Sequence, residues 1–229
     1  MSHQHSVETH LGVVAADYDR VIRTFIPGYE QMLSTIAWWL SEVVPPDGRV
    51  IDLGGGTGAL AESVLTALPN VRLEIWDVDP KMLAVARERL QRFGTRIRLR
   101  ERSFTEKLEE CNAVIATLSL HHLSTLNQKR AVYSNIYEAL SKPAVFLNGD
   151  CTMDLTEPAR SIILRYWLKF MVAHGISEAD ARKHFSEWDK EDTYYQISDE
   201  LTALAQAGFP RPEVYWKEGP ITVYGGMKS

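Results

Sequence analysis

The sequence predicts one α/β domain in which a mostly parallel, seven-stranded sheet lies between two layers of helices and ends in an antiparallel hairpin. Three observations predict this fold. Short apolar runs alternate with helix-like segments, a glycine-rich turn follows the first core strand, and residues 213–224 have the pattern of two adjacent strands. Alternating strand and helix patterns are typical of parallel sheets, because parallel strands need crossover connections.

The composition fits one globular domain without a nucleic-acid or membrane partner. The 229 residues are 45% hydrophobic, and 25 basic against 30 acidic residues give a net charge of −5, so no basic surplus is available for a phosphate backbone. We find no signal peptide and no apolar run of membrane-spanning length, and we expect a cytoplasmic protein. Cys111 and Cys151 cannot form a disulfide framework or a zinc site, and His3, His5 and His10 lie irregularly on a polar tail, so we expect no metal.

Residues 1–45 precede the first core strand and contain a helix-like stretch with aromatic side chains, among them Tyr18 and Tyr29. Apolar residues recur at helical spacing there, which predicts an amphipathic helix. We expect this segment to fold over a cofactor as a helical lid. The alternative is that its aromatic residues only pack the helix onto the sheet.

The chain is organised around residues 50–58, where an apolar run ends in Asp52 and four glycines follow. The glycines are Gly54, Gly55, Gly56 and Gly58. This pattern indicates a strand, a tight turn and a helix. Glycine suits such a turn because the backbone takes up angles that a Cβ disfavours, and because it lies bare against an anionic or polar ligand at the helix N-terminus.

Two cofactor classes use such a turn. Read from Gly54, the pattern G-x-G-x-x-A fits the dinucleotide fingerprint of NAD-binding proteins. Read from Asp52, the pattern D-x-G-x-G-x-G fits the acidic turn of S-adenosylmethionine (SAM) enzymes. The second pattern accounts for more residues and favours SAM over NAD.

An acidic residue closes the second predicted strand, residues 71–76. Asp77 follows this strand directly, and an acid there can accept hydrogen bonds from both hydroxyls of an adenosine ribose. Asp79 and Pro80 have the pattern of an N-cap and first residue of the next helix. Asp79 therefore has a structural explanation, whereas Asp77 indicates a ligand.

Two more strands lead to the same edge of the sheet. Residues 97–99 form the third predicted strand, and Ser103 and Phe104 follow it where an adenine would lie. Residues 113–116 form the fourth, which runs into Thr117. Ligands bind at the C-terminal ends of parallel strands in open α/β sheets, so these residues should face one crevice.

Polar residues after the fourth and fifth strands are candidates for catalysis. His121 or His122 could act as a general base, or could only cap the helix that we expect to begin at Ser124. The fifth strand, residues 144–147, leads to Asp150. This carboxylate could contact a substrate amine or form a turn.

Residues 155–195 are rich in aromatic side chains and predict an insertion of two or three helices before the last hairpin. Its aromatic residues are Tyr166, Trp167, Phe170, Phe185, Trp188, Tyr194 and Tyr195. The insertion either covers the crevice or provides an ordinary packed surface, which could form a homodimer.

Taken together, the βα units, the glycine turn, the acid after the second strand and the closing hairpin resemble the Rossmann-like fold of class I SAM-dependent methyltransferases. The resemblance covers nearly the whole chain and implies a single SAM-binding domain, residues 1–229. Within this superfamily the chain is most similar to carboxy-S-adenosylmethionine synthases, in residues 26–29, 52–54, 173–175 and 207–209. The SAM site that this resemblance implies comprises Tyr29, Gly54, Gly55, Gly56, Asp77, Val78, Ser103, Phe104 and Thr117. The pattern of the glycine turn adds Asp52 and Gly58 to the expected cofactor-binding residues.

The chain also departs from these synthases. They place an arginine to hold the added carboxylate, and an ungapped match puts Phe185 at that position. A phenyl ring cannot pair with a carboxylate, so carboxy-SAM synthesis is not expected. Ser103 stands where family members carry an acid and Thr117 where they carry an asparagine, which implies weaker polar contacts with the same cofactor.

The predicted function is methyl transfer from SAM to a small-molecule acceptor. Such an enzyme must align donor and acceptor and exclude water, and the rings of Tyr18 and Tyr29 could stabilise the sulfonium by cation–π attraction. His122 and Asp150 complete the predicted catalytic residues. The main alternative is a cyclase, in which SAM's own amino or carboxylate group attacks its γ-carbon, gives azetidine-2-carboxylate or a homoserine lactone, and releases methylthioadenosine. A carboxy-SAM synthase-like enzyme and a non-catalytic SAM-binding module are lesser alternatives.

Overall fold

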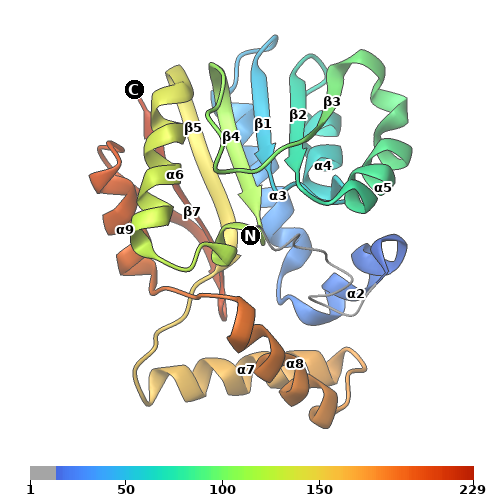
Figure 1. Cartoon of the computed structure of the whole chain (residues 1–229), viewed down its shortest axis with the longest axis vertical. Coiled ribbons are helices and arrows are strands. Elements are labelled where there is room, and N and C mark those ends of the chain that lie inside the picture. The colour runs from blue at the N-terminus through green and yellow to red at the C-terminus, as the bar shows by residue number, and fades with distance from the viewer. Residues whose placement is uncertain (1–13) are drawn as a thin grey trace.

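The computed structural model describes residues 14–229, so the tail histidines His3, His5 and His10 lie outside the described residues. Seven strands form one sheet in the order β3-β2-β1-β4-β5-β7-β6 (Figure 1). Strands β1 to β5 pair with one another in parallel. Strand β7 is antiparallel to both of its neighbours, β5 and β6. The predicted mostly parallel sheet with a closing antiparallel hairpin is confirmed.

The elements follow one another in βα alternation through most of the chain. The strands are β1 Arg49–Leu53, β2 Arg72–Asp77, β3 Ile97–Glu101, β4 Cys111–Thr117, β5 Leu140–Cys151, β6 Glu213–Glu218 and β7 Ile221–Lys228. The helices are α2 Tyr18–Phe25, α3 Tyr29–Val43, α4 Ala59–Ala67, α5 Pro80–Leu90, α6 Leu126–Ala139, α7 Ala159–Ala173, α8 Glu178–Glu191 and α9 Ile197–Gln206. Short 3₁₀ turns span Ala15–Asp17, Gln91–Arg96 and Leu120–His122.

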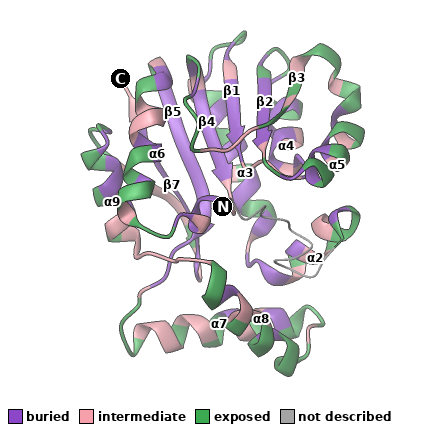
Figure 2. Cartoon of the chain, in the orientation of Figure 1, coloured by how far each residue is buried: buried purple, intermediate pink, exposed green. Residues whose placement is uncertain are grey.

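The sheet is buried on both faces, which makes the domain three layers thick (Figure 2). Successive side chains of a strand point to opposite faces, and β4 shows the result. Ala113 and Ile115 pack in the cluster that includes α3, α4 and α5, whereas Val114 and Ala116 pack in the cluster that includes α6 and α9. Near-continuous apolar strands of this kind are typical of parallel sheets covered by helices.

Two predicted boundaries differ from the structure. Helix α6 is capped by Thr125 and not opened by Ser124, because Thr125 and Gln128 form a reciprocal capping box. Strand β5 begins at Leu140, before Pro143, although we expected it to start at residue 144. The register shift against β4 pairs Cys111 with Leu140 and Ala113 with Val145, so Pro143 is not paired with a β4 residue. Because no ladder hydrogen bond is required from its backbone nitrogen, a proline is tolerated there.

Residues 155–195 fold mainly as the helix pair α7 and α8, which lies beyond the C-terminal ends of the parallel strands, near α2 (Figure 1). The Trp167 indole N–H of α7 donates a hydrogen bond of 2.6 Å to the carbonyl of Phe25, at the end of α2. The Trp188 ring of α8 packs against both, with ring centroids 5.5 Å from Phe25 and 5.4 Å from Trp167. The insertion and the N-terminal helices therefore meet over the edge of the sheet that carries the site.

No helix within residues 14–229 is both long and apolar enough to cross a lipid bilayer.

Candidate active site

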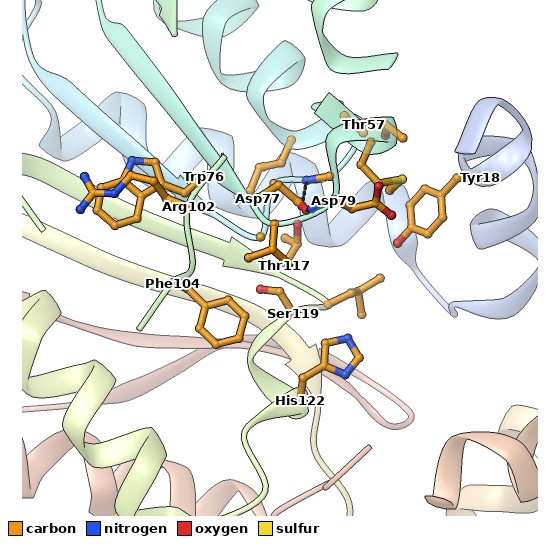
Figure 3. A pocket seen from close by; sticks show the side chains of 18 of the residues that line it. Tyr18, Thr57, Trp76, Asp77, Asp79, Arg102, Phe104, Thr117, Ser119 and His122 are labelled. Atoms are coloured by element: carbon orange, nitrogen blue, oxygen red, sulfur yellow. Dashed lines mark hydrogen bonds between the residues drawn. The ribbon is translucent and has the colours of Figure 1, made fainter. Parts of the chain in front are cut away.

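A cavity of about 420 Å³ opens at the C-terminal ends of β1, β2 and β4 (Figure 3). Open α/β sheets bind their ligands at this edge. Most of the predicted site residues line it: Tyr18, Tyr29, Gly54, Gly55, Gly56, Asp77, Val78, Ser103, Phe104, Thr117 and His122. We call it the larger cavity.

The glycine turn forms one wall of the larger cavity. Gly54 and Gly56 have φ angles of +66° and +53°, which only glycine adopts readily. A Cβ on Gly54 would lie 2.5 Å from the Cβ of Ser119, so the turn also needs glycine for space. Gly58 is not part of the lining of the larger cavity. It has φ +79° at the start of α4, and a Cβ there would lie 2.8 Å from a methyl carbon of Leu90, so its role is packing.

Asp77 is held in the wall by two backbone N–H groups. Those of Gly56 and Asp79 donate to its two carboxyl oxygens at 2.9 and 2.8 Å. Burial raises the pKa of Asp77, and the two N–H groups oppose this shift by stabilising the charged form. Asp79 caps α5 as predicted, since its side chain accepts from the backbone N–H of Lys81 at 2.9 Å.

Residues that the sequence analysis did not select complete the far end of the larger cavity. The Arg102 guanidinium lies 4.0 Å from the Trp76 ring centroid, beside Ser103 and Phe104. Ser103 shares a hydrogen bond of 2.8 Å with the Thr105 hydroxyl. Trp76 directly precedes Asp77 at the C-terminal end of β2, and this position at the ligand-binding edge could have indicated it.

Tyr18 and Tyr29 line the larger cavity from α2 and α3. Asp19 fixes α2 beside the glycine turn, because the Thr57 hydroxyl donates to its carboxylate at 2.8 Å and Arg89 pairs with it. Burial raises the pKa of both tyrosines, so they are neutral phenols. Whether α2 moves as a lid stays a prediction.

Asp52 lies behind the turn and outside the lining of the larger cavity. Its side chain is fully buried, and a Cβ on Gly55 would lie 2.7 Å from its carboxyl oxygen. Neither carboxyl oxygen has a hydrogen-bond partner among the described residues. Burial and the nearby Asp77 raise the pKa of Asp52 to about 8. This placement favours a role beneath the turn over the direct cofactor contact that we expected.

Asp150 is also absent from the lining of the larger cavity and of the second cavity described below. This placement does not favour the substrate contact that we expected. It is 1% exposed and holds His121: the His121 backbone N–H donates to it at 3.0 Å, and Nδ1 lies 2.6 Å from its other oxygen. Burial alone would lower the pKa of His121, but Asp150 and Asp192 raise it above its usual value. For Asp150, burial acts to raise the pKa, and the His121 charge and hydrogen bond bring it below its usual value. The pair therefore fixes the loop after β4.

A second cavity of about 80 Å³ adjoins the first, and we call it the smaller cavity. Tyr18, Leu118 and His122 line both cavities. The other walls of the smaller cavity are mostly apolar and come from distant segments: Ile22, Phe25, Ile26, His121, Cys151, Trp167, Trp188, Asp192 and Tyr194.

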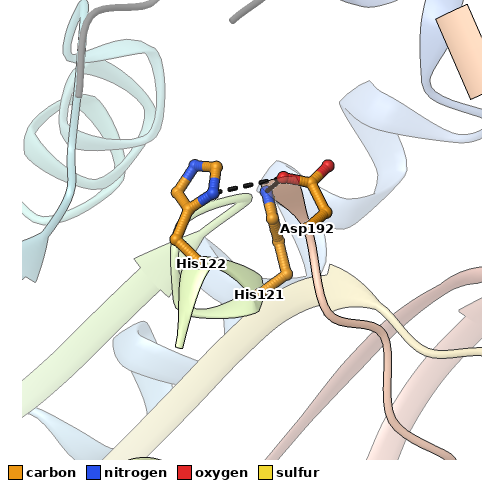
Figure 4. A group of neighbouring side chains, drawn as sticks. All are labelled: His121, His122 and Asp192. Atoms are coloured by element: carbon orange, nitrogen blue, oxygen red, sulfur yellow. Dashed lines mark ion pairs between the residues drawn. The ribbon is translucent and has the colours of Figure 1, made fainter. Parts of the chain in front are cut away.

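A carboxylate and two imidazoles meet at the edge of the smaller cavity (Figure 4). Asp192 Oδ1 lies 3.2 Å from His122 Nδ1 and 3.7 Å from His121 Nε2, and the Tyr194 hydroxyl donates to Asp192 Oδ2 at 2.7 Å. The nitrogen and oxygen atoms of this cluster lie up to 4.8 Å apart. A tetrahedral zinc site would hold its ligand atoms about 3.3–3.6 Å apart, so we interpret the cluster as a buried carboxylate held by its neighbours. No sequence pattern marks Asp192 as a site residue, because it follows α8, far along the chain.

Phe185 packs within the aromatic cluster of the insertion. Its ring centroid lies 5.1 Å from that of Trp167 and 5.9 Å from that of Trp188, and it lines neither cavity.

Comparisons with known proteins agree with this architecture. Residues 51–146 match the model of a methyltransferase domain family. The chain is 20% identical over 216 residues to a carboxy-S-adenosyl-L-methionine synthase of Nautilia profundicola, covering 94% of this chain and 92% of the relative. It is 26% identical over 212 residues to the synthase of Shewanella sediminis, covering 89% and 86%.

A solved structure extends the comparison to the fold. Human N-acetylserotonin methyltransferase in complex with SAM superposes with a TM-score of 0.60 at 18% identity, covering 86% of this chain. This chain spans only 51% of the human one. The sheet order, the glycine turn and these matches place the chain in the class I SAM-dependent methyltransferase superfamily. The superfamily and the cofactor class predicted from the sequence, SAM, are thereby confirmed.

Proposed function

We propose that this protein binds SAM in the larger cavity and transfers its methyl group to a small-molecule acceptor. One observation carries the proposal: the glycine turn, the Asp77 carboxylate, the half-buried Tyr18 and the buried Tyr29 line one cavity at the ligand-binding edge of a methyltransferase fold. A bare backbone, an acceptor for ribose hydroxyls and aromatic rings match the three parts of SAM in turn.

The residues assigned to binding follow from their positions. Asp77 accepts hydrogen bonds from the ribose hydroxyls, since two N–H groups hold its carboxylate at the rim of the glycine turn. Phe104 and Ser103 border the adenine. The backbone of Gly54 and Gly56 lies open to the ligand because neither residue has a side chain there.

The chemistry of transfer requires little covalent participation from the protein. SAM supplies a methyl group on a positively charged sulfur, which is already a good donor. The chain aligns donor and acceptor and excludes water. Tyr18 and Tyr29 remain uncharged, and the π faces of their rings can attract a cation. Tyr29 already makes one such contact, since the Arg23 guanidinium carbon lies 5.4 Å from its ring centroid.

The alternatives gain less support from the site. The smaller cavity adjoins the larger one and provides room for a separate acceptor, which intramolecular cyclisation does not need. Carboxy-SAM synthesis needs a cation for the added carboxylate. Of the described residues that line the two cavities, Arg102 carries the one guanidinium or ammonium group, and it lies beside Trp76 at the other end of the site.

The proposal is tested by the products formed from SAM. Purified protein should bind S-adenosylhomocysteine in calorimetry and should not consume SAM appreciably without an acceptor. Gly56→Val should abolish binding, because its side chain enters the cavity at a positive φ angle. Steady formation of methylthioadenosine from SAM alone, absent in Gly56→Val, would establish the cyclase instead, and carboxy-SAM in the mass spectrum would establish the synthase.

A further inference from the structure

We propose that the smaller cavity is the acceptor site and that its acceptor is a small phenol, a single aromatic ring with an ionisable hydroxyl. The inference rests on the proposed function and names the substrate class of the same site. It is carried by a juxtaposition: a cavity walled by aromatic rings meets the His122–Asp192 pair at the point where it joins the larger cavity.

The walls fit a flat apolar ring. Phe25, Trp167 and Trp188 supply three ring systems. The Trp188 ring centroid lies 5.5 Å from that of Phe25 and 5.4 Å from that of Trp167. The indole N–H of Trp167 is fixed on the Phe25 carbonyl, so the wall is ordered before any ligand arrives. Aromatic pairs prefer such tilted or offset geometry, and a volume of about 80 Å³ limits the occupant to about one ring.

The junction directs the ligand toward the donor. Tyr18, Leu118 and His122 line both cavities, so His122 is within reach of a ring held in the smaller cavity and of a donor held in the larger one. Leu118 has φ +48° and is the one residue other than glycine with a positive φ within residues 14–229. Its N–H donates to the Gly149 carbonyl at 2.9 Å. Strained backbone of this kind concentrates at functional sites.

The His122–Asp192 pair selects the hydroxyl. Asp192 is 3% exposed, its Oδ1 lies 3.2 Å from His122 Nδ1, and Tyr194 donates to its other oxygen. At this distance the carboxylate stabilises the positive charge that the His122 imidazole gains when it takes up a proton. An imidazole takes a proton far more readily from a phenol than from an alcohol, because the phenol has the lower pKa and is the stronger acid.

The step balances as an in-line displacement. The phenol proton passes to the His122 imidazole, and an oxygen electron pair forms the new O–CH₃ bond. The S–CH₃ bond of SAM breaks, and its electron pair stays on sulfur. The products are an aryl methyl ether and S-adenosylhomocysteine, and the proton on His122 is then released to water.

Binding is tested first by calorimetry on the full chain saturated with S-adenosylhomocysteine. Phenol should bind, and both cyclohexanol, which is not flat, and 2-naphthol, which has two rings, should bind at least tenfold more weakly. Cys151→Met should reduce phenol binding at least tenfold, because the longer side chain fills the cavity from its wall. Cys111→Met is the matched control: it is also a buried cysteine but packs in the other core cluster, and it should bind phenol normally.

The ligand series keeps the test decisive if Cys151→Met fails to fold. Equal binding of phenol and 2-naphthol, or no binding of phenol while S-adenosylhomocysteine binds, would overturn the inference and leave the proposed function standing. Absence of S-adenosylhomocysteine binding would instead refute the proposed function. With SAM and phenol, methoxybenzene should form, and His122→Ala should lower kcat at least a hundredfold while the phenol affinity in calorimetry changes less than threefold. Unchanged kcat in His122→Ala would remove its role as the base.

Discussion

Among single side chains, Asp77 has the clearest assignment to ligand binding. We predict that Asp77→Ala weakens binding of S-adenosylhomocysteine by about 1–3 kcal/mol, because the ribose hydroxyls lose a charged acceptor. Calorimetry measures the effect. Asp47→Ala is the control, since Asp47 is exposed and precedes β1, at the opposite edge of the sheet. Equal affinities of the Asp77 variant and the wild type would contradict the assignment.

Asp52 should make the stability of the fold depend on pH. Its pKa is about 8 in the folded chain against 3.8 for an ordinary aspartate. Between these values the unfolded chain releases the proton and the folded chain keeps it, so the free energy of unfolding falls as pH rises from about 4 to about 8 and then levels off.

We therefore predict that Asp52→Asn gains stability relative to the wild type as pH rises. The difference in the free energy of unfolding should increase by about 3–4 kcal/mol between pH 5 and pH 8, in favour of the variant. Urea titrations at both pH values measure it. Parallel pH curves for the two proteins would show that Asp52 is ionised in the folded state, and Asp47→Asn provides the baseline.

At the level of helices, Trp167 connects the insertion to the N-terminal segment. Trp167→Phe keeps an aromatic ring but leaves the buried Phe25 carbonyl without its donor, at a cost of about 1–3 kcal/mol. We predict faster amide hydrogen exchange in α2, measured by mass spectrometry on peptides covering residues 18–25, with the core strands unchanged. Trp38→Phe should exchange like the wild type, because Trp38 is 56% exposed on α3. Uniform loss of protection across the sheet would indicate global destabilisation instead.

Across the whole molecule, a buried charged network joins α6, α9 and the sheet. Lys129 Nζ lies 2.6 Å from Glu200 Oε1 with both side chains 1% exposed, and the Tyr133 hydroxyl donates to the other Glu200 oxygen at 2.6 Å. Tyr133 and Tyr224 share a hydrogen bond that extends the network to β7. Because these groups are removed from water, each depends on its partner.

We predict that Lys129→Met destabilises the protein by about 3–5 kcal/mol, because it leaves the Glu200 carboxylate buried without its cation. Urea unfolding measures the loss, and the double variant with Glu200→Gln should recover part of it. Arg182→Met, which breaks an exposed pair with Glu178, should cost less than about 1 kcal/mol. A cost for Lys129→Met as small as that of the exposed pair would mean that water reaches Glu200.

The donor side of the site could be predicted from the sequence because it is local. The C-terminal ends of β1, β2 and β3 and the turns that follow them carry Gly54, Asp77 and Ser103 to one edge, and strand order alone brings them together. Asp150 shows where this reasoning ends. It lies on a strand whose side chains alternate, so Cys151 lines the smaller cavity and Asp150 points to the opposite side.

The acceptor side could not be predicted, because it depends on tertiary contacts. Trp167, Trp188 and Asp192 reach His122 only through the folding of α7 and α8 over the sheet, and no spacing in the sequence encodes that contact. The aromatic composition of residues 155–195 indicated that the segment was special, and left open what its rings would face.

The two cavities are built by separate parts of the chain. The turns that form the larger cavity lie mostly within residues 51–146, the part that matches the methyltransferase family, whereas the rings of the smaller cavity stand on helices outside it. Acceptor preference is thereby open to change by substitution in α7 and α8 while the donor site keeps its sequence. A library randomised at Trp167 and Trp188 would let this scaffold be redirected to new acceptors, while Asp77 and the glycine turn stay unchanged in every variant.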